Sequence, residues 1–387
     1  MPPSASVGRQ DLIVLSYSQM HNRGKLPSYA FLSPEATQRL ADVTQQGTYG
    51  LSPFEKMWMG RRPQLLEHGY VLRPRYAQDW RPSWIGTNID PFYCEDSIMS
   101  MTLNIIDARA SDGKLVAIKR LQNTGQEIEI AQFFTSIKHP HNHCVPVVDV
   151  FSDTLDPTWT FMVMPYLRPF DNPEFEMVGE VIEFVRQMLE GLAFLHSHSV
   201  AHRDIAVPNV MMDGRPLYPQ GHHPVRMDSS VDAIDELKPL RRIDVQIKYF
   251  YVDFGLSVKF PPGGSSQVVG NLGRDASVPE LSWTVPYDAY KADVHALGTV
   301  FQKEFQQKYH DMDFLAPLVD CMKQRQPELR PPASELVSMF QQLCKLENPS
   351  KARWRLSTRA ESGPERMIND TIAAARDGLS NLKRFVG

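Results

Sequence analysis

The sequence predicts an α+β fold in two unequal parts, a small strand-rich part with one main helix and a larger helical part. The β-branched run KLVAIKR, residues 114–120, is typical of a strand, and helical spacing follows at residues 126–137. A broad apolar face at helical spacing runs through residues 176–200. We therefore expect the smaller part over residues 93–167 and the larger over residues 168–345.

Composition and charge are those of a globular chain that can bury a sizeable core. The 387 residues are 42% hydrophobic and 22% charged, which suits one large domain with extensions. The net charge of −4 gives no general attraction to nucleic acid, so we expect no such partner. A local group of arginines is expected to be solvated or ion-paired: Arg61, Arg62, Arg73, Arg75 and Arg81.

The cysteines and the hydropathy of the chain indicate the cell compartment in which the protein is expected to reside. The four cysteines are scattered and form no CxxC pair, which argues against a zinc site or a disulfide framework and for a reducing compartment. The N-terminal apolar run is too short for a signal peptide, and no segment is long enough to span a bilayer. We expect an intracellular protein, cytoplasmic or nuclear, with no membrane partner and an unknown oligomeric state.

Two segments precede the strand-rich part. Residues 1–50 contain Ser, Gln and Pro with weak periodicity, so we expect a flexible segment. Residues 51–92 are rich in aromatics and arginine and too apolar for a linker. They are expected to form an extension that packs on the main domain.

Four further segments complete the expected elements. CVPVVDVF (144–151) and WTFMVMPYL (159–167) are predicted strands. Residues 214–247 are rich in Pro, His and Asp and are predicted to form a long surface insertion. Residues 281–345 again have helical patterns.

The tail, residues 346–387, is predicted to contain an amphipathic helix. Its apolar positions recur at steps of four and three: Ile368, Ile372, Ala375, Leu379 and Leu382. We favour docking of this apolar face on the helical part of the same chain over docking on a partner.

Four polar residues, in order along the chain, have the chemistry that phosphoryl transfer from ATP requires. Lys119 lies on the predicted strand 114–120, where its ammonium group could hold the phosphates. Asp204 could accept the substrate proton or orient the acceptor hydroxyl. Asn209 in the same loop and Asp253 after a later apolar strand offer the oxygen ligands that Mg²⁺ prefers.

The motifs that hold these residues resemble those of eukaryotic protein kinases. VAIK, HRD with a following Asn, and DFG match at residues 116–119, 202–209 and 253–255. The resemblance covers roughly residues 93–345. The stretches GYVLRPRY and NHCVPVVDVF also resemble a divergent kinase group of mushroom-forming fungi.

Two supporting motifs extend the resemblance. VPE, residues 278–280, resembles the APE motif, whose glutamate pairs with an arginine. Here the pair would be Glu280 with Arg330, and we expect it to be buried. ADVHALG contains Asp293, which by the resemblance anchors the catalytic loop.

The resemblance implies a two-lobed protein-kinase fold, with a small β-rich N-lobe and a larger helical C-lobe. It implies an ATP-dependent, Mg²⁺-requiring enzyme that acts on a protein substrate. Catalysis would depend on Asp204, Lys119 and Asn209, and Mg²⁺ would bind to Asn209 and Asp253. Lys119 and Asp253 would also contact the nucleotide.

The resemblance further implies an adenine site. Met164 resembles the gatekeeper of the family, and the three residues after it resemble the hinge that reads adenine through backbone groups: Pro165, Tyr166 and Leu167.

The family also has a glutamate, on the helix after the lysine strand, that pairs with the lysine. Glu127 is favoured, because Ile130, Ala131 and Phe134 follow at +3, +4 and +7. Glu129 is the alternative.

The glycine-rich loop of the family is missing. Its glycines would fall near Ile98, Ser100 and Leu103, none of which is glycine. Glycines let the backbone approach phosphates closely, so their absence puts nucleotide affinity in question. Ile98 and Leu103 are expected to pack a stiffer hairpin instead.

Ala206 is a second departure. Serine/threonine kinases carry a lysine there, which bridges the γ-phosphate, the catalytic aspartate and a threonine; that threonine would fall at Gly273. The two are lost together, which indicates a rebuilt site. Tyrosine kinases also carry an alanine here, but with an arginine at the position of Pro208, so neither substrate class has its markers. We favour serine or threonine substrates over tyrosine.

Arg203 precedes the catalytic aspartate. In the family this arginine marks kinases that are often ordered by a phosphate in the activation loop. Ser265 and Ser266 are candidates for that phosphate, and an unmodified loop is the alternative.

An active protein kinase is the leading hypothesis, because the residues that would touch magnesium, phosphate and hydroxyl are all present. The alternative is a pseudokinase that acts as a nucleotide- or protein-binding regulatory module, supported by the missing glycines and Ala206. A small-molecule kinase is disfavoured by the APE-like Glu280 and by Arg330.

Overall fold

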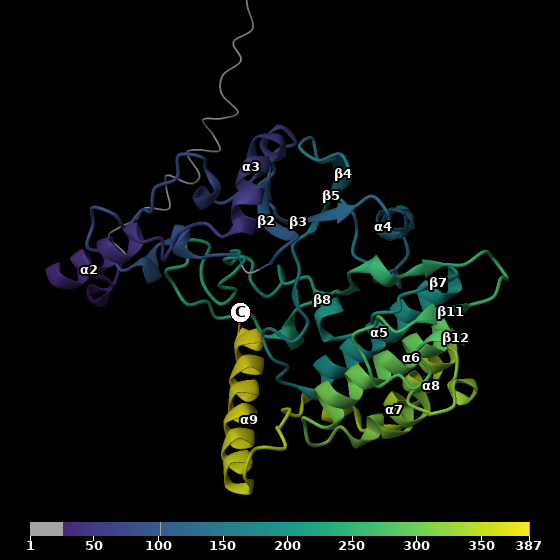
Figure 1. Ribbon diagram of the computed structural model, residues 1–387. Coiled ribbons are helices and arrows are strands. Elements are labelled where there is room, and N and C mark those ends of the chain that lie inside the picture. The colour runs from purple at the N-terminus through teal and green to yellow at the C-terminus, as the bar shows by residue number, and fades with distance from the viewer. Residues whose placement is uncertain (1–25, 101, 387) are drawn as a thin grey trace, which may run out of the picture. The chain divides into compact units, whose positions relative to one another are not determined.

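The computed structural model describes residues 26–100 and 102–386, with side chains up to residue 373 and at residue 375. The chain divides into two compact units (Figure 1). The first consists of Met1–Arg120, Asp153–Pro157 and Tyr218–Lys238, and the second of Leu121–Ser152, Thr158–Leu217 and Pro239–Gly387. Antiparallel strands and helices both contribute, so the predicted α+β class is confirmed.

An N-terminal helix replaces part of the segment expected to be flexible. Helix α2, Pro34–Gln45, starts where Ser33 Oγ accepts a hydrogen bond from the Ala36 amide at 3.3 Å. A serine cap followed by proline at the first helical position is a strong helix start. The expectation of flexibility is therefore wrong over these residues, and residues 1–25 lie outside the described part of the chain.

Helix α3, Pro53–Glu67, forms the first half of the aromatic and arginine-rich extension. Ser52 and Glu55 close a reciprocal capping box at its start. The Glu55 carboxylate also accepts a hydrogen bond from Arg75 Nε at 2.8 Å, and both side chains are buried. The Glu55 carboxylate thus both caps the start of α3 and binds the buried Arg75 of the extension.

Three consecutive strands pair side by side in the first unit. Strand β1, Tyr70–Val71, pairs antiparallel with β2, Ile105–Ala110, which pairs antiparallel with β3, Leu115–Gln122. Ile105 lies opposite Lys119. The predicted strand around Lys119 is confirmed, and the extension supplies the strand next to β2.

The arginine group of the extension is largely ion-paired. Three of its five members have acidic partners in the first unit: Arg61 with Asp153 at 2.6 Å, Arg73 with Asp107 at 3.1 Å, and Arg75 with Glu55 at 2.8 Å. The predicted ion pairs are confirmed for these three. Buried arginines need such partners because an unpaired charge away from water is costly.

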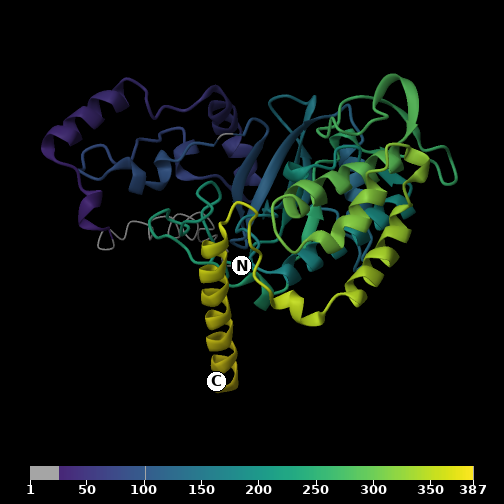
Figure 2. The ribbon, with the colours of Figure 1, turned by 90° about the horizontal axis from the view of Figure 1, so that it is seen from below.

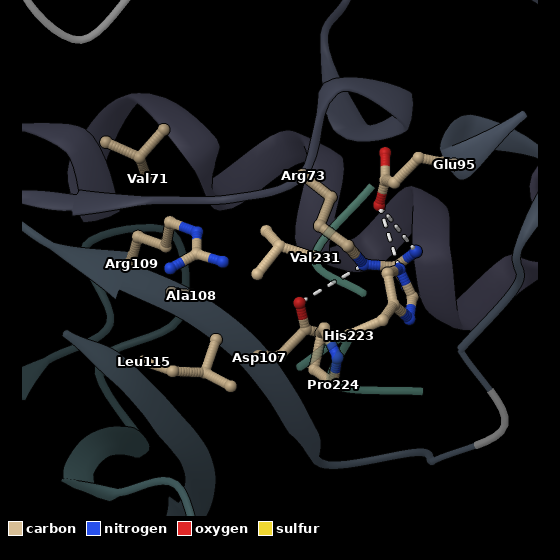
Figure 3. A pocket seen from close by; sticks show the side chains of 10 residues that line it. All are labelled: Val71, Arg73, Glu95, Asp107, Ala108, Arg109, Leu115, His223, Pro224 and Val231. Atoms are coloured by element: carbon tan, nitrogen blue, oxygen red, sulfur yellow. Dashed lines mark hydrogen bonds and ion pairs between the residues drawn. The ribbon is translucent and has the colours of Figure 1, made fainter. Parts of the chain in front are cut away.

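Part of the insertion is packed inside the first unit and is not a surface loop. His223 is buried, and its Nε2 lies 3.3 Å from the Glu95 carboxylate, which also accepts from Arg73 (Figure 3). Burial alone would raise the pKa of Glu95, but the bond from His223 and the charge of Arg73 outweigh it and lower that pKa. The cavity beside this cluster holds only about 10 Å³, roughly the space of one water.

The second unit begins with helix α4, Glu127–Ser136, as predicted. Strands β4, Asp149–Ser152, and β5, Trp159–Pro165, follow and pair antiparallel. The strand expected over CVPVVDVF is wrong in its first half. There Pro146 has no amide hydrogen to donate, and the preceding residue instead donates to the Tyr251 carbonyl at 3.0 Å.

Four helices form the body of the second unit (Figures 1 and 2): α5, Val178–Ser197; α6, Ala289–Phe301; α7, Ala316–Met322; and α8, Ala333–Leu346. Helix α8 packs on α5 and α7 packs on α6. The predicted long helix is confirmed. The helical pattern expected from residue 281 is wrong at its start, where Ser282–Asp288 form strand β12 against β11, Gln267–Gly270.

Short strand pairs hold the loops between these helices. They are β6, Arg168–Pro169, β8, Val210–Met212, and β9, Tyr249–Tyr251, in one sheet, and β7, Val200–Ala201, with β10, Val258–Lys259. The HRD motif follows β7 and the DFG motif follows β9. Both motifs are therefore fixed at the ends of paired strands.

The tail contains helix α9, Gly363–Val386 (Figure 2). Ile368 and Ile372 are 60% and 47% exposed, so the expected docking of the apolar face on the same chain is wrong at these positions. Polar contacts anchor the helix instead, including Arg366 with Asp311 at 2.6 Å. The side chains of Leu379 and Leu382 lie outside the described residues. None of the helices in the described residues is long and apolar enough to cross a membrane.

Candidate active site

Asp293 fixes the backbone of the loop that carries the HRD motif. This carboxylate, on α6, is 1% exposed and accepts hydrogen bonds from the amides of His202 at 2.8 Å and Arg203 at 2.7 Å. These bonds hold Arg203 in the left-handed region at a φ of 66°. The predicted anchoring role of Asp293 is confirmed.

His202 links this loop to the strand before the DFG motif. Its buried ring lies 3.1 Å from the Val252 carbonyl through Nε2, and the Ser257 hydroxyl donates to the His202 carbonyl at 3.0 Å. Burial disfavours the charged imidazole and lowers the pKa of His202. The residue thus acts as a neutral structural link.

Asp204 and Asn209 lie together at the end of this loop. Asn209 Nδ2 donates to the Asp204 carbonyl and to Asp204 Oδ2, both at 2.8 Å. Because the amide nitrogen is used in this way, the Asn209 amide oxygen points away from Asp204. No donor to that oxygen occurs in the described part of the chain, so it remains available as a ligand.

Arg274 is a member of the site that sequence reasoning missed. Its backbone amide donates to Asp204 Oδ1 at 2.7 Å, and its Nε donates to Asp204 Oδ2 at 3.1 Å. Its Nη2 also lies 3.9 Å from the Asp253 carboxylate. Only the adjacent Gly273, where a threonine was expected, was a signal in the sequence that this segment is unusual.

Asp253 and Glu127 approach the same glycine. Asp253 is in the left-handed region, with φ 65° and ψ 73°. A Cβ placed on Gly255 would lie 3.3 Å from an oxygen of Asp253 and 3.3 Å from Glu127 Oε2. Glu127 is buried and Glu129 is exposed, so the structure favours Glu127 over its alternative.

Lys119 and the hinge residues occupy the expected elements. Lys119 is half-buried on β3 in the first unit, whereas Glu127 belongs to the second. Met164 is a buried residue of β5, and Tyr166 and Leu167 follow that strand directly. The pairing of Lys119 with Glu127 stays a prediction.

The stretch that lacks glycines does not form the stiffer hairpin that was expected. Ile98 is buried, but Leu103 is 50% exposed, and residues 98–104 contain no strand among the described positions. The Ser100 amide lies within hydrogen-bond distance of the Glu55 carboxylate, at 3.4 Å. The strand paired with β2 on this side is β1, so the extension replaces the expected hairpin partner.

Glu280 and Arg330 form the expected buried ion pair. Two parallel hydrogen bonds join Arg330 Nη1 and Nη2 to the two oxygens of Glu280, at 2.5 and 2.9 Å. The Arg330 side chain is fully buried and that of Glu280 is 11% exposed. The assignment of VPE as an APE-like motif is supported by this contact.

Comparison with known proteins agrees with the resemblance of the motifs to those of protein kinases. The model of the protein kinase domain matches residues 104–346, which is more than half of the chain. Serine/threonine-protein kinase oca2 of Schizosaccharomyces pombe is 25% identical over 60% of this chain and 34% of its own length. NUAK family SNF1-like kinase 2 of Rattus norvegicus is 25% identical over 50% of this chain and 29% of its own length.

The chain therefore spans about a third or less of the length of these curated relatives. The matched region contains the HRD loop, the DFG motif and the Glu280–Arg330 ion pair described above. The chain belongs to the protein kinase domain family and has the two-lobed α+β fold of that family.

Proposed function

We propose that this chain is an ATP-dependent, Mg²⁺-requiring protein kinase that transfers the γ-phosphate to a serine or threonine hydroxyl. The observation that carries the proposal is the joined Asp204–Asn209 pair on a loop whose backbone Asp293 fixes. Catalysis of phosphoryl transfer consists largely of positioning and electrostatic stabilisation, and this arrangement is preorganised for both.

The acceptor hydroxyl would bind to Asp204. An ionised carboxylate has about four acceptor positions. Three are filled, two on Oδ2 by Asn209 and Arg274 and one on Oδ1 by the Arg274 amide. The remaining position on Oδ1 can receive the substrate O–H as its oxygen bonds to the γ-phosphorus; the bond to the departing ADP breaks, and Asp204 takes the proton.

The donors of the site fit a magnesium ion. The Asn209 amide oxygen and the Asp253 carboxylate are the hard oxygen ligands that Mg²⁺ prefers. The described residues contain no group of three or more His, Cys, Asp or Glu side chains that could hold a metal ion, so nucleotide oxygens and water would complete the coordination. Bound Mg²⁺ would neutralise the charge of the transferred phosphate.

The nucleotide would be held by Lys119 and by the hinge. Lys119 is expected to contact the phosphates and to be oriented by Glu127, which is buried at the start of α4. Backbone groups of Tyr166 and Leu167 would read the adenine beside Met164. Serine or threonine acceptors are favoured because the relative oca2 is named as a serine/threonine-protein kinase.

Transfer of labelled γ-phosphate from Mg²⁺-ATP to a peptide library with serine, threonine and tyrosine acceptors tests this function. The proposal predicts incorporation that requires Mg²⁺, with phosphoserine or phosphothreonine in the product. Incorporation confined to tyrosine would contradict the proposed serine or threonine acceptors. No incorporation at all would contradict the proposed kinase activity.

The alternative is a pseudokinase, favoured by the absence of glycine at Ile98, Ser100 and Leu103. Its discriminating property is the absence of transfer to any acceptor. A thermal shift then distinguishes the two kinds of module, because a ligand at 100 times its Kd stabilises the folded state by about 2.7 kcal/mol. A Mg²⁺-ATP shift without transfer would favour a nucleotide-binding pseudokinase, and neither shift nor transfer would favour a protein-binding one.

A further inference from the structure

Arg274 brings a positive charge to the catalytic aspartate from a different part of the chain. Its amide and its Nε donate to the two oxygens of Asp204, at 2.7 and 3.1 Å. Its Nη2 lies 3.9 Å from Asp253. One guanidinium therefore lies beside both carboxylates of the site, in a chain where Ala206 has no charge to offer.

Gly273 makes this placement possible. A Cβ at this position would lie 2.9 Å from the Arg203 carbonyl oxygen, closer than real Cβ atoms come to backbone. Only glycine lets the segment pass so close to the HRD loop, and the next amide, that of Arg274, thereby reaches Asp204. The absence of a threonine at Gly273 thus has a physical explanation.

The end of the Arg274 side chain is available to a ligand. The side chain is 53% exposed, although the Asp204 carboxylate is only 9% exposed. Within the part of the chain that the structure describes, Nη1 and Nη2 have no hydrogen-bond acceptor, and Nη2 has only the 3.9 Å ion pair to Asp253. These nitrogens form the part of the guanidinium fork that binds phosphate oxygens in two parallel bonds.

The charges of the site favour a further cation in addition to Lys119 and Mg²⁺. Two carboxylates, Asp204 and Asp253, would repel the oxygens of a transferring phosphoryl group unless positive charge offsets them. An arginine that contacts a transferring phosphoryl group typically raises kcat by large factors. A guanidinium already bonded to Asp204 would also keep that carboxylate in a fixed orientation.

We propose that Arg274 is a catalytic residue that binds the oxygens of the transferring γ-phosphoryl group while its Nε and amide orient Asp204. The inference rests on the proposed kinase function. The transferred group is the phosphoryl group of ATP, and the bond changes are those given above; Arg274 supplies charge and gives up no proton, since a guanidinium stays protonated in proteins.

Single-turnover transfer from labelled Mg²⁺-ATP by the full chain tests this role. Arg274→Ala should lower the rate about 10²-fold or more, the loss typical of one donor to a transition-state oxyanion. Arg325→Ala is the matched control, because Arg325 is exposed and lies on the loop after α7. Nucleotide Kd, measured by titration, should change far less than the rate.

Rescue separates a catalytic charge from a structural contact. Lysine at 206 supplies a cation next to Asp204 from the loop itself, so Arg274→Ala with Ala206→Lys should regain part of the lost rate. Arg274→Lys should retain more activity than Arg274→Ala, because it keeps the charge but not the fork.

The outcomes are distinguishable. An active wild type with unchanged transfer in Arg274→Ala overturns the role of Arg274 and leaves the kinase standing. Faster transfer in Arg274→Ala also overturns it, since Arg274 would then be a latch that blocks Asp204. A wild type without transfer overturns the proposed function, and the role of Arg274 with it.

Discussion

Asp204 receives hydrogen bonds from two segments that lie about seventy residues apart, Asn209 in its own loop and Arg274 beyond the DFG motif. At the scale of single residues, the site depends on such pairings more than on the motifs alone. Glu127 and Glu129 illustrate the point, because two glutamates separated by one residue differ completely in burial.

Glu127→Gln should lower kcat roughly tenfold or more, because it removes the charge expected to orient Lys119. The exposed Glu129→Gln is the matched control and should leave transfer unchanged. Steady-state kinetics with Mg²⁺-ATP measures both. Equal losses in the two variants would contradict the assignment.

Glu280→Gln should destabilise the fold by about 3–5 kcal/mol, because it leaves the fully buried Arg330 charge without its counter-ion. Urea unfolding measures the change. Glu328→Gln removes an exposed carboxylate nearby in sequence and should leave the midpoint unchanged. If the Glu280 variant unfolds like the wild type, the ion pair does not stabilise the fold.

At the scale of elements, the activation segment is held by hydrogen bonds from the Arg203 side chain of the HRD loop. Its Nη2 donates to the carbonyl of Val269 in strand β11 at 2.9 Å, and its Nη1 donates to the Leu256 carbonyl at 3.4 Å. The arginine expected to bind a phosphate is thus already engaged with the chain.

Replacing Ser265 and Ser266 together by alanine should therefore leave transfer unchanged, since Arg203 is held by carbonyls and not by a phosphate. Initial rates of the double variant, of the wild type as purified and of the phosphatase-treated wild type measure this. A tenfold slower double variant, or an inactive dephosphorylated wild type, would show that a phosphate orders the segment.

At the scale of the whole chain, neutral buried histidines link stability to pH. Burial lowers the pKa of His143 to about 4 and that of His295 to about 4. In the unfolded chain both titrate near pH 6.5. The unfolded state therefore binds more protons than the folded state between these values, so the free energy of unfolding falls as the pH falls through this window.

Urea unfolding at pH 7 and pH 5 should accordingly give a lower free energy of unfolding at pH 5. His143→Gln removes one titrating group and should reduce the difference between the two pH values. A difference that is equal in the wild type and the variant would contradict the neutral, buried state of His143.

The sequence predicted those features that a local periodicity or a family motif encodes. The strand with Lys119, helices α4 and α5, and the Glu280–Arg330 pair follow from periodicity or from motifs with fixed partners. Helix α2 was missed because its cap and proline were outweighed by weak periodicity over a longer stretch.

The remaining misses depend on contacts between distant segments. The position of Arg274 against Asp204 follows from a close backbone approach at Gly273, which no local pattern encodes. Burial of His223 in the first unit likewise depends on Glu95, a partner far away in sequence. Strand β12 exists because its pairing partner β11 lies beside it, so its helical pattern was overridden by tertiary structure.

Asp204 is proposed to take the proton of the acceptor hydroxyl, and one measurement tests this role directly. Single-turnover transfer of labelled γ-phosphate from Mg²⁺-ATP should be about 10²-fold slower or more in Asp204→Asn than in the wild type, with nucleotide binding retained. The amide keeps the size of the carboxylate but cannot take the proton of the acceptor hydroxyl. An equal rate in the two proteins would contradict the assignment of Asp204 and, with it, the proposed mechanism.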